Sequence, residues 1–444
     1  MALISEEAAE ESTPIFVRAD WLVALAAALV SGAVYFYTAQ PNVGLLDSGE
    51  FIVAAQHFGV PHPTGYPLWT LLAWLFQLLP LGNAAWEVNL FSGFCGALAV
   101  GATTLLASSM LRWMMPWWGE GKTGTPLIRA LIAFSSGLLF AFSFSFWTQA
   151  VIAEVYTLHG LLVALFIISL YWWVRRPSRD LPILASFFTF SLCMSNHHLT
   201  LALVPLPLLV PLLIRRSVFW EVLVASVVSG ALVYLGFAWL SDDQTTWSTA
   251  MRFFYFAMLA LIVLLVLKWR RTDLRIVLLV PLAVILGLLP YAYMPIASST
   301  NPPMNWGYTS TPEGFFYSIN RTQYAGSLSD LVVRTLGKGM GTAPEKPPEP
   351  EDPNRVSTLT MGREFAAFYL RKLVQNFTPW SIIAVLGAVL GILRLPLRQR
   401  TFLYLLFGGF LLAAFLQPVM ERTQTTIDAW SLQFPYHGYA YLLF

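Results

Sequence analysis

The sequence predicts an all-α polytopic membrane protein, and its composition, its apolar runs and the placement of its basic residues all indicate this class. Of its 444 residues, 57% are hydrophobic and only 11% are charged, whereas a soluble domain carries about 25% charged residues. The mean hydropathy is +0.63. A formal charge of +2 is too small to indicate a nucleic-acid partner or a basic protein of the membrane surface.

Apolar runs recur along the chain, and a spanning helix needs about 20 mostly apolar residues. The candidate spans are 21–40, 89–111, 129–147, 156–174, 181–196, 199–214, 218–240, 251–267, 274–297, 379–395 and 402–418. A further run, 66–82, contains Pro67, Gln77 and Pro80 and is short for a span. We therefore expect about 11–12 transmembrane helices, with 66–82 as an interfacial helix in the first outer loop.

The basic residues collect in every second loop, as the positive-inside rule predicts for the cytoplasmic face. If 66–82 lies along the surface, 16 of the 26 basic residues share that face. They are Arg18, Arg112, Lys122, Arg129, Arg175, Arg176, Arg179, Arg215, Arg216, Lys268, Arg270, Arg271, Arg275, Arg394, Arg398 and Arg400. The loops 41–88, 148–155, 196–198, 241–250 and 298–378 then share the outer face, where we expect the polar chemistry to converge.

Three smaller features concern the ends of the chain and its cysteines. The N-terminus "MALISEEAAEESTP" is acidic where a signal peptide would be basic, so we expect the run from Trp21 to be a retained first helix. Cys95 and Cys193 both lie in apolar spans, which excludes a disulfide framework or a clustered metal site. The terminal "GYAYLLF" begins a further apolar run and leaves open whether the natural protein continues past Phe444.

We divide the chain into three parts. Residues 1–297 form a transmembrane module that includes the first outer loop, 41–88. Residues 298–378 form an outer-face loop, which is partly flexible because "GTAPEKPPEPEDPNR" is rich in proline and charge. Residues 379–444 form C-terminal transmembrane helices.

Asp47 and Glu50 in "LLDSGEF" are the first candidates for chemistry. They lie three residues apart, which on a helix places both side chains on one face. The same spacing is also used to cap a helix N-terminus. A carboxylate at membrane depth costs about 2.5–3.5 kcal/mol, so both acids should lie at the interface or in a wet cavity. The spacing leaves two interpretations open, a helix cap and a general base.

Further candidates lie in three other outer segments. His62 in "HPTGYP" is held in a proline and glycine turn and could bind a phosphate or a hydroxyl. Glu154 either caps the helix that follows it or faces Asp47 from the same side. Adjacent His197 and His198 point in different directions on a helix, which disfavours a metal site of the i, i+4 kind. These two histidines either anchor a helix tip at the interface or donate to a lipid phosphate.

The loop after residue 297 adds two candidates. Arg321 is the basic residue best suited to a phosphate, because its guanidinium forms a fork that matches this anion. Trp306 could stack on a sugar ring or anchor the loop at the membrane surface.

Taken in order, these residues resemble a family of polytopic proteins related to the protein O-mannosyltransferases, within the GT-C superfamily of membrane glycosyltransferases. The matching segments are "DSGEF", "HPTGYPL", "EVNLFSG", "WTQAVIAEVYTLH", "SNHHLT" and "NPPMNW…NRTQY", and they cover most of residues 20–325. The resemblance implies a GT-C-type bundle with residues 1–297 as its catalytic module. It also implies transfer of a single, mannose-like sugar from a polyprenyl-phosphate donor to a hydroxyl acceptor, a protein Ser or Thr or a glycan. The expected membrane is the bacterial inner membrane or the ER membrane, with the active site on the periplasmic or lumenal side.

The resemblance also implies roles for individual residues. Asp47, with Glu50 beside it, corresponds to the acid of the first outer loop that serves as general base or metal contact. The "HPTGYP" segment resembles a His-Pro stretch of that loop, and Glu154 corresponds to the acidic segment before the next outer-face helix. The family commonly places an arginine after its "Y-x-P-I" segment, where this chain has Ala297. This departure shifts the expected phosphate contact to Arg321.

The implied mechanism is a single displacement. Asp47 would accept the proton of the hydroxyl as it attacks the anomeric carbon, and cationic or N–H donors would stabilise the lipid phosphate that leaves. This scheme requires no cofactor. Asp47, Glu50 and Glu154 could also hold a divalent metal, because hard cations prefer carboxylates.

The alternative classes of protein are a lipid or solute transporter or flippase and a structural scaffold. Transporters usually show internal repeats and charges near the middle of their spans, and neither is clear in this sequence. A scaffold would not need acids at the outer ends of unrelated helices. The sequence therefore favours a glycosyltransferase.

Overall fold

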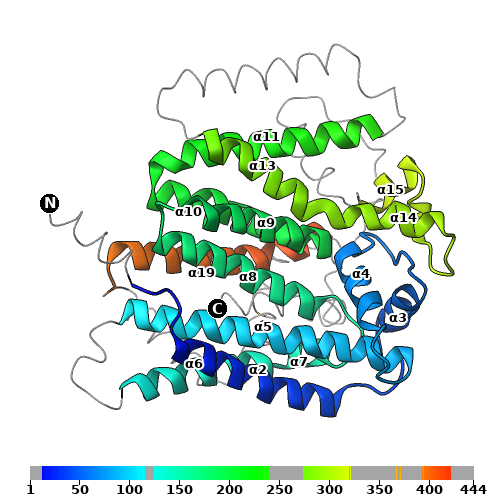
Figure 1. Ribbon diagram of the computed structural model, residues 1–444, viewed down its shortest axis with the longest axis horizontal. Helices are drawn as coiled ribbons and strands as arrows, with labels where there is room; N and C mark the ends of the chain where they lie inside the picture. Colours follow the sequence, from blue (N-terminus) through cyan, green and yellow to red (C-terminus); the bar gives the residue numbers. More distant parts are fainter. Residues whose placement is uncertain are drawn as a thin grey trace.

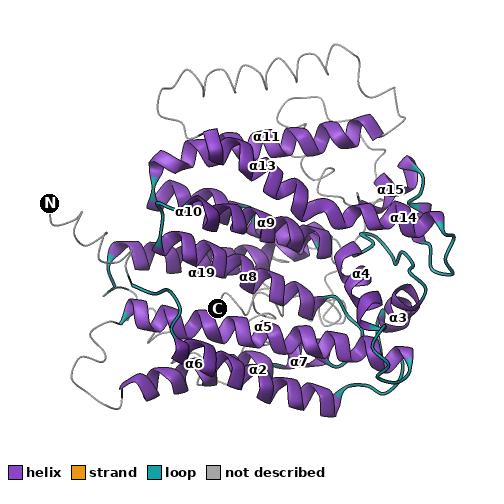
Figure 2. Cartoon of the chain, viewed as in Figure 1, coloured by secondary structure: helices purple, strands orange, loops and turns teal. Residues whose placement is uncertain are grey.

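The structure is a computed structural model that describes residues 13–115, 125–240, 274–319 and 395–421, together with residues 321, 367, 371 and 393. Within these residues the regular secondary structure is helical, and β pairing is limited to one isolated parallel bridge between Val60 and Asn305 (Figure 2). The predicted all-α class is confirmed.

Eight long helices lie side by side in the described part of the chain and run roughly along one direction (Figure 1). They are α2 (Arg18–Thr38), α5 (Ala84–Met114), α6 (Thr125–Ala141), α8 (Tyr156–Arg175), α9 (Asp180–Asn196), α11 (Arg216–Leu240), α13 (Leu274–Leu288) and α19 (Leu397–Glu421). The shorter elements are α3 (Ser48–Gln56), α4 (Pro67–Phe76), α7 (Phe144–Ala150), η1 (His198–Leu203), α10 (Pro205–Ile214), η2 (Leu289–Ala292), α14 (Tyr293–Ser299), η3 (Trp306–Tyr308) and α15 (Pro312–Ile319).

Five helices of the described residues are long and apolar enough to cross a membrane, or six if α6 and α7, bent by 68°, form one span. The predicted spans 181–196 and 199–214 form shorter apolar helices, α9 with 17 residues and the segment His198–Ile214. The predicted spans 251–267 and 379–395, and most of the predicted loop 298–378, lie outside the described residues. The helices that are described agree with a polytopic membrane protein.

The ambiguous run 66–82 forms the ten-residue helix α4. A helix of this length extends about 15 Å, roughly half of the hydrocarbon core of a bilayer. Together with α3 and α14 it lies at one end of the bundle (Figure 1). The helix is therefore too short to form a span by itself, while its position at the membrane interface stays a prediction.

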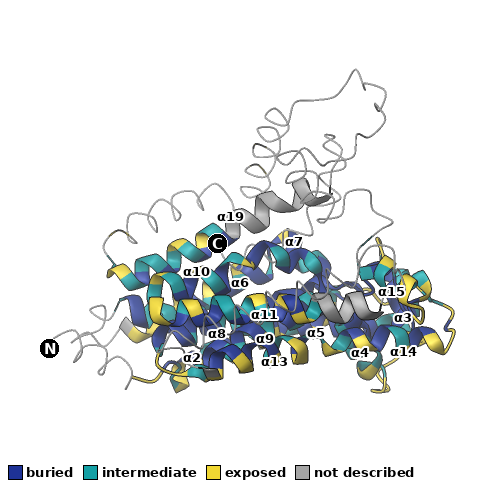
Figure 3. Ribbon diagram, turned by 90° about the horizontal axis from the view of Figure 1, so that it is seen from above, coloured by how far each residue is buried: buried dark blue, intermediate teal, exposed yellow. Residues whose placement is uncertain are grey.

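Close packing around α5 holds the N-terminal half of the bundle together. This helix contacts α2, α6 and α8, and buried positions run through the middle of the bundle (Figure 3). Gly96 lies so close to Tyr35 that an added Cβ would be 3.2 Å from its ring. Tyr35 in turn donates its hydroxyl to the Ala141 carbonyl at 2.8 Å. Small residues of this kind let apolar helices approach closely within a membrane.

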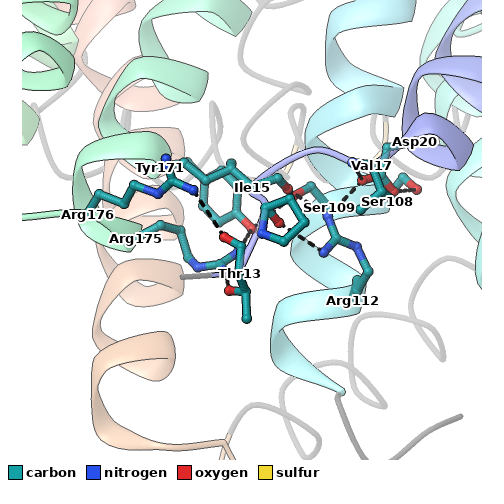
Figure 4. Close-up of polar contacts among 11 residues, drawn as sticks. Thr13, Ile15, Val17, Asp20, Ser108, Ser109, Arg112, Tyr171, Arg175 and Arg176 are labelled. Atoms are coloured by element: carbon teal, nitrogen blue, oxygen red, sulfur yellow. Dashed lines mark hydrogen bonds and ion pairs between the residues drawn. The ribbon is translucent and has the colours of Figure 1, made fainter. Parts of the chain in front are cut away.

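The end of the bundle opposite α3 and α4 holds a polar network built on arginines (Figure 4). Arg112 forms an ion pair with Asp20 at 2.8 Å. Arg175 donates to Tyr171 Oη at 3.0 Å and to Thr13 Oγ1 at 2.9 Å. Arg112 also donates to the Ile15 carbonyl at 2.7 Å, and together with the Thr13 contact this bond holds the segment before α2 across the ends of α5 and α8. The described basic residues of this network and the acidic and histidine-rich loops therefore lie at opposite ends of the bundle.

The contact between α9 and α13 can be tested at Gly287. A Cβ at this residue would lie 2.6 Å from the Phe188 carbonyl and 2.6 Å from Ser191 Cβ, so Gly287→Ala should lower the free energy of unfolding by about 1–3 kcal/mol. Gly230→Ala on α11 is the matched control, because no atom lies within 4 Å of its added Cβ and alanine favours a helix. Thermal unfolding in one detergent compares the two variants. Equal thermal midpoints for the two variants would contradict the close packing of α9 against α13 at Gly287.

Candidate functional site

Asp47 lies at the N-cap position of α3, but its side chain makes no capping hydrogen bond. The carboxylate is 53% exposed. Its backbone carbonyl accepts the Phe51 N–H at 3.0 Å, which starts the helix without help from the side chain. The capping interpretation is therefore wrong for Asp47, and the structure leaves this carboxylate exposed at the end of the bundle that carries α3 and α4.

Glu50 turns its carboxylate toward the "HPTGYP" segment instead of the helix N-terminus. One oxygen accepts the backbone N–H of His62, and the other lies 3.2 Å from His62 Nδ1. Because a carboxylate only accepts hydrogen bonds, Nδ1 carries the ring proton. His62 Nε2 then accepts the hydroxyl of Tyr66 at 2.9 Å. Glu50 thus ties the turn to α3 through two bonds.

His62 also lies near Asp47 without being hydrogen-bonded to it. Its Nε2 is 4.0 Å from Asp47 Oδ2, which is beyond hydrogen-bond distance. The His62 side chain is only 12% exposed, so its partners are set by the protein more than by water.

Glu154 lies between α7 and α8 and is 2% exposed. The backbone N–H groups of Val155 and Asp47 donate to its carboxylate, and Ser92 Oγ bonds to both its N–H and its carbonyl at 3.2 Å. Burial, and after it the negative charge of Asp47, raises the pKa of Glu154 well above its ordinary value. Glu154 is therefore a buried acid that favours its neutral form, directly behind the exposed Asp47.

His197 follows the last residue of α9 and is 4% exposed. Its Nδ1 accepts the backbone N–H of Leu199 at 3.1 Å, so the neutral ring carries its proton on Nε2. Burial, followed by the nearby His159 and Arg321, lowers the pKa of His197 well below its ordinary value. His197 is a buried neutral donor, which does not fit an anchor at the membrane surface.

His198 points away from His197 and toward η2. Its Nε2 lies 2.8 Å from Tyr291 Oη, which donates to the Met194 carbonyl at 2.9 Å. His198 and Tyr291 also line a cavity of about 430 Å³ between α9, α10, α11 and α13. Most of the other lining residues are apolar, among them Phe187, Leu201, Leu208 and Val284.

Arg321 and Trp306 reach the site from the segment after α14. Arg321 follows α15, has a left-handed backbone conformation (φ 54°), and lies close enough to His197 to affect its protonation. The backbone N–H of Trp306 donates to the Val60 carbonyl at 2.9 Å. Its ring lies 6.5 Å from that of His62 and is partly exposed. Trp306 therefore borders the acidic site.

The structure adds one residue that the sequence did not single out, Tyr66. Its hydroxyl bonds to His62, and its ring lies 5.5 Å from the ring of His197. The only signal in the sequence is its position in "HPTGYP". His57, by contrast, lies after the end of α3 and is exposed. Among the described residues, no group of three or more His, Cys, Asp or Glu side chains has the arrangement of a metal site.

Known proteins resemble the part of the chain that carries most of this site. Residues 47–220 match a family model for the "Protein O-mannosyl-transferase TMEM260 N-terminal domain". This range begins at Asp47 and contains the acids and histidines described above, while Trp306 and Arg321 lie beyond it.

Two curated relatives extend the similarity. "Protein O-mannosyl-transferase TMEM260" of Mus musculus is 28% identical over 301 residues, which is 67% of this chain and 33% of that protein. "Protein O-mannosyl-transferase tmem260" of Dictyostelium discoideum is 24% identical over 406 residues, or 86% of this chain and 38% of that protein. The chain thus spans little more than a third of these relatives. No solved structure matches it. The similarities support an O-mannosyltransferase-like family, as the sequence motifs indicated.

Replacing Glu154 by Gln should reduce the pH dependence of stability. The folded-state pKa of Glu154 lies above its ordinary value of 4.5, so the stability it contributes is full below that value and is lost as the pH rises through the folded pKa. Glu154→Gln has no proton to release. Between about pH 5 and about pH 8, its thermal midpoint should therefore fall less than that of the unmodified protein. Parallel curves from thermal unfolding across this range would contradict the burial of an ionisable Glu154.

Proposed function

We propose that this chain is the catalytic membrane module of a glycosyltransferase that moves a single, mannose-like sugar from a polyprenyl-phosphate donor to a protein Ser or Thr hydroxyl. The observation that carries the proposal is the carboxylate of Asp47, which is exposed and makes no capping hydrogen bond. It lies at the same end of the bundle as the buried donor His197. The names of the relatives, both called O-mannosyl-transferase, support the reaction class.

The three acids differ in their suitability as a base. Glu50 already accepts two bonds from His62, and Glu154 is buried and favours its neutral form. Asp47 alone of the three combines exposure with an oxygen that no capping bond occupies. A general base must reach the proton that it accepts, so we assign this role to Asp47, which takes the hydroxyl proton as the oxygen attacks the anomeric carbon.

The donor phosphate would leave near His197 and Arg321. In its neutral form His197 presents Nε2–H as a donor, since Nδ1 accepts from Leu199. The guanidinium of Arg321 lies nearby and supplies positive charge. Donors held in place before the reaction stabilise an anion that forms during it. Trp306, beside His62 and partly exposed, would stack on a sugar at the rim of the site.

The cavity beside His198 supports a lipid-linked donor. Its lining is mainly apolar, and it reaches the α9–η1 tip that also carries His197. An isoprenoid tail in this cavity would place its phosphate near the donors of that tip. Burial of an apolar chain contributes about 0.8 kcal/mol for each CH₂ group, so the cavity would favour a lipid phosphate over a soluble sugar phosphate.

The two ends of the bundle differ in charge, and this difference supports an active site on the outer face. The arginine network at the opposite end involves Arg112 and Arg175, and basic loops favour the cytoplasm. The acids and histidines of the site lie at helix ends and in loops. This arrangement favours surface chemistry over the transport pathway of the alternative function.

Replacing Asp47 by Asn should abolish most sugar transfer while the protein still folds. The change removes a base but keeps the shape of the side chain, and a positioned base contributes about 10²–10⁴-fold to the rate. Transfer to a Ser- and Thr-containing peptide by purified protein, with a panel of polyprenyl-phosphate sugars, measures the effect. Asp180→Asn, the same change in the first turn of α9, is the matched control. Full activity of Asp47→Asn would overturn the assignment of the base.

Filling the apolar cavity should weaken binding of the lipid donor. Gly230 lines the cavity, and a Cβ there meets no atom within 4 Å. Gly230→Leu should therefore raise the KM for the lipid donor by about tenfold, equivalent to about 1.4 kcal/mol, and leave the acceptor KM unchanged. Gly408→Leu on α19 is the control, since its Cβ also meets no atom within 4 Å. An unchanged donor KM in Gly230→Leu would exclude the cavity as the lipid site.

A further inference from the structure

Tyr66 has a backbone conformation that its side chain does not favour. Its φ of 40° and ψ of 51° lie in the left-handed region, and it stands directly before Pro67, the first residue of α4. A bulky residue with positive φ is uncommon and costs free energy. Such a conformation persists only where surrounding contacts hold it. The contacts of the Tyr66 side chain therefore indicate what role this residue has.

The contacts of Tyr66 join two parts of the site. The side chain is buried, and its ring packs on Phe51 at 5.3 Å and on His197 at 5.5 Å. Its hydroxyl lies 2.9 Å from His62 Nε2. Phe51 belongs to α3, which Asp47 precedes, whereas His197 belongs to the tip of α9. Tyr66 thus connects α3, which carries Glu50 and follows Asp47, with the buried donor His197.

The hydroxyl of Tyr66 is the second of two contacts that favour one position of the ring proton of His62. Glu50 accepts from Nδ1, and Tyr66 donates to Nε2, so both contacts favour the tautomer with the proton on Nδ1. In this tautomer Nε2 has no proton to offer Asp47, which lies 4.0 Å away. In the other tautomer Nε2–H would be a donor, and a movement of about 1 Å would bring it within hydrogen-bond distance of that carboxylate.

We propose that Tyr66 is a positioning residue that locks the tautomer of His62 and so keeps His62 from occupying the base, Asp47. The inference rests on the proposed function for its kinetic consequence, but its structural core concerns only the proton on His62. Loss of the hydroxyl would leave the Nδ1–H tautomer held by Glu50 alone. A larger share of His62 would then carry its proton on Nε2 and, after a movement of about 1 Å, donate it to Asp47. The carboxylate that should accept the substrate proton would then be engaged.

Tyr66→Phe tests the lock because it keeps the ring contacts with Phe51 and His197 and removes only the hydroxyl. We expect kcat for sugar transfer to fall about tenfold, since one misplaced catalytic group has effects of this size or larger, with the donor KM and the thermal midpoint nearly unchanged. Tyr156→Phe is the matched control, because Tyr156 also packs on His197, at 5.6 Å. An unchanged kcat in Tyr66→Phe would overturn the proposal.

A second variant separates this role from a general structural one. In Tyr66→Phe/His62→Asn the shorter amide can still donate to Glu50 but has no nitrogen at the position of Nε2. The double variant should therefore recover part of the kcat that Tyr66→Phe loses, a coupling that a double-mutant cycle measures. A double variant as impaired as Tyr66→Phe, or more so, would contradict the lock.

The tautomer can be measured without activity, by side-chain ¹⁵N NMR with the His62 signals assigned from their loss in His62→Asn. The unmodified protein should show the Nδ1–H tautomer, and Tyr66→Phe should shift toward Nε2–H. An Nε2–H tautomer in the unmodified protein, or no shift in the variant, would overturn the lock. If no lipid-phosphate sugar is transferred while the tautomers behave as expected, the proposed function fails and the lock stands.

Discussion

The end of the bundle that carries α3 and α4 depends on the two-point contact between Glu50 and His62. One carboxylate oxygen accepts the backbone N–H of His62, and the other faces its ring. Hydrogen bonds to a charged acceptor are the stronger kind, and both side chains are largely shielded from water. The contact fixes the "HPTGYP" turn against α3. Through that turn it also sets the direction of α4 and the place of Tyr66 beside His197.

Three carboxylates within a short distance acquire three different properties from their surroundings. Asp47 is exposed, Glu50 is held by His62, and Glu154 is buried against the backbone of Asp47. Burial of Glu154 favours its neutral form, which limits the negative charge gathered behind Asp47. A single site can therefore keep one acid available as a base while its neighbours serve the structure around it.

The sequence anticipated where the polar residues gather but not how they pair. The alternation of basic loops placed Asp47, Glu154 and His197 at one end, and the structure puts them there, opposite the Arg112 network. The spacing of Asp47 and Glu50 could not distinguish a helix cap from a general base, because two acids three residues apart are compatible with either role. Tyr66 was missed because a left-handed φ leaves no mark on a tyrosine in the sequence.

By itself, the sequence determined the all-α membrane class, the family resemblance and the two-ended distribution of charge. These follow from hydropathy and basic loops, which are properties summed over segments of the chain. Only the tertiary structure decided that Glu50 binds His62, that Glu154 is buried and that Tyr66 reaches His197. Such pairings join segments far apart in the chain, and a hydrogen bond forms or fails over a fraction of an ångström.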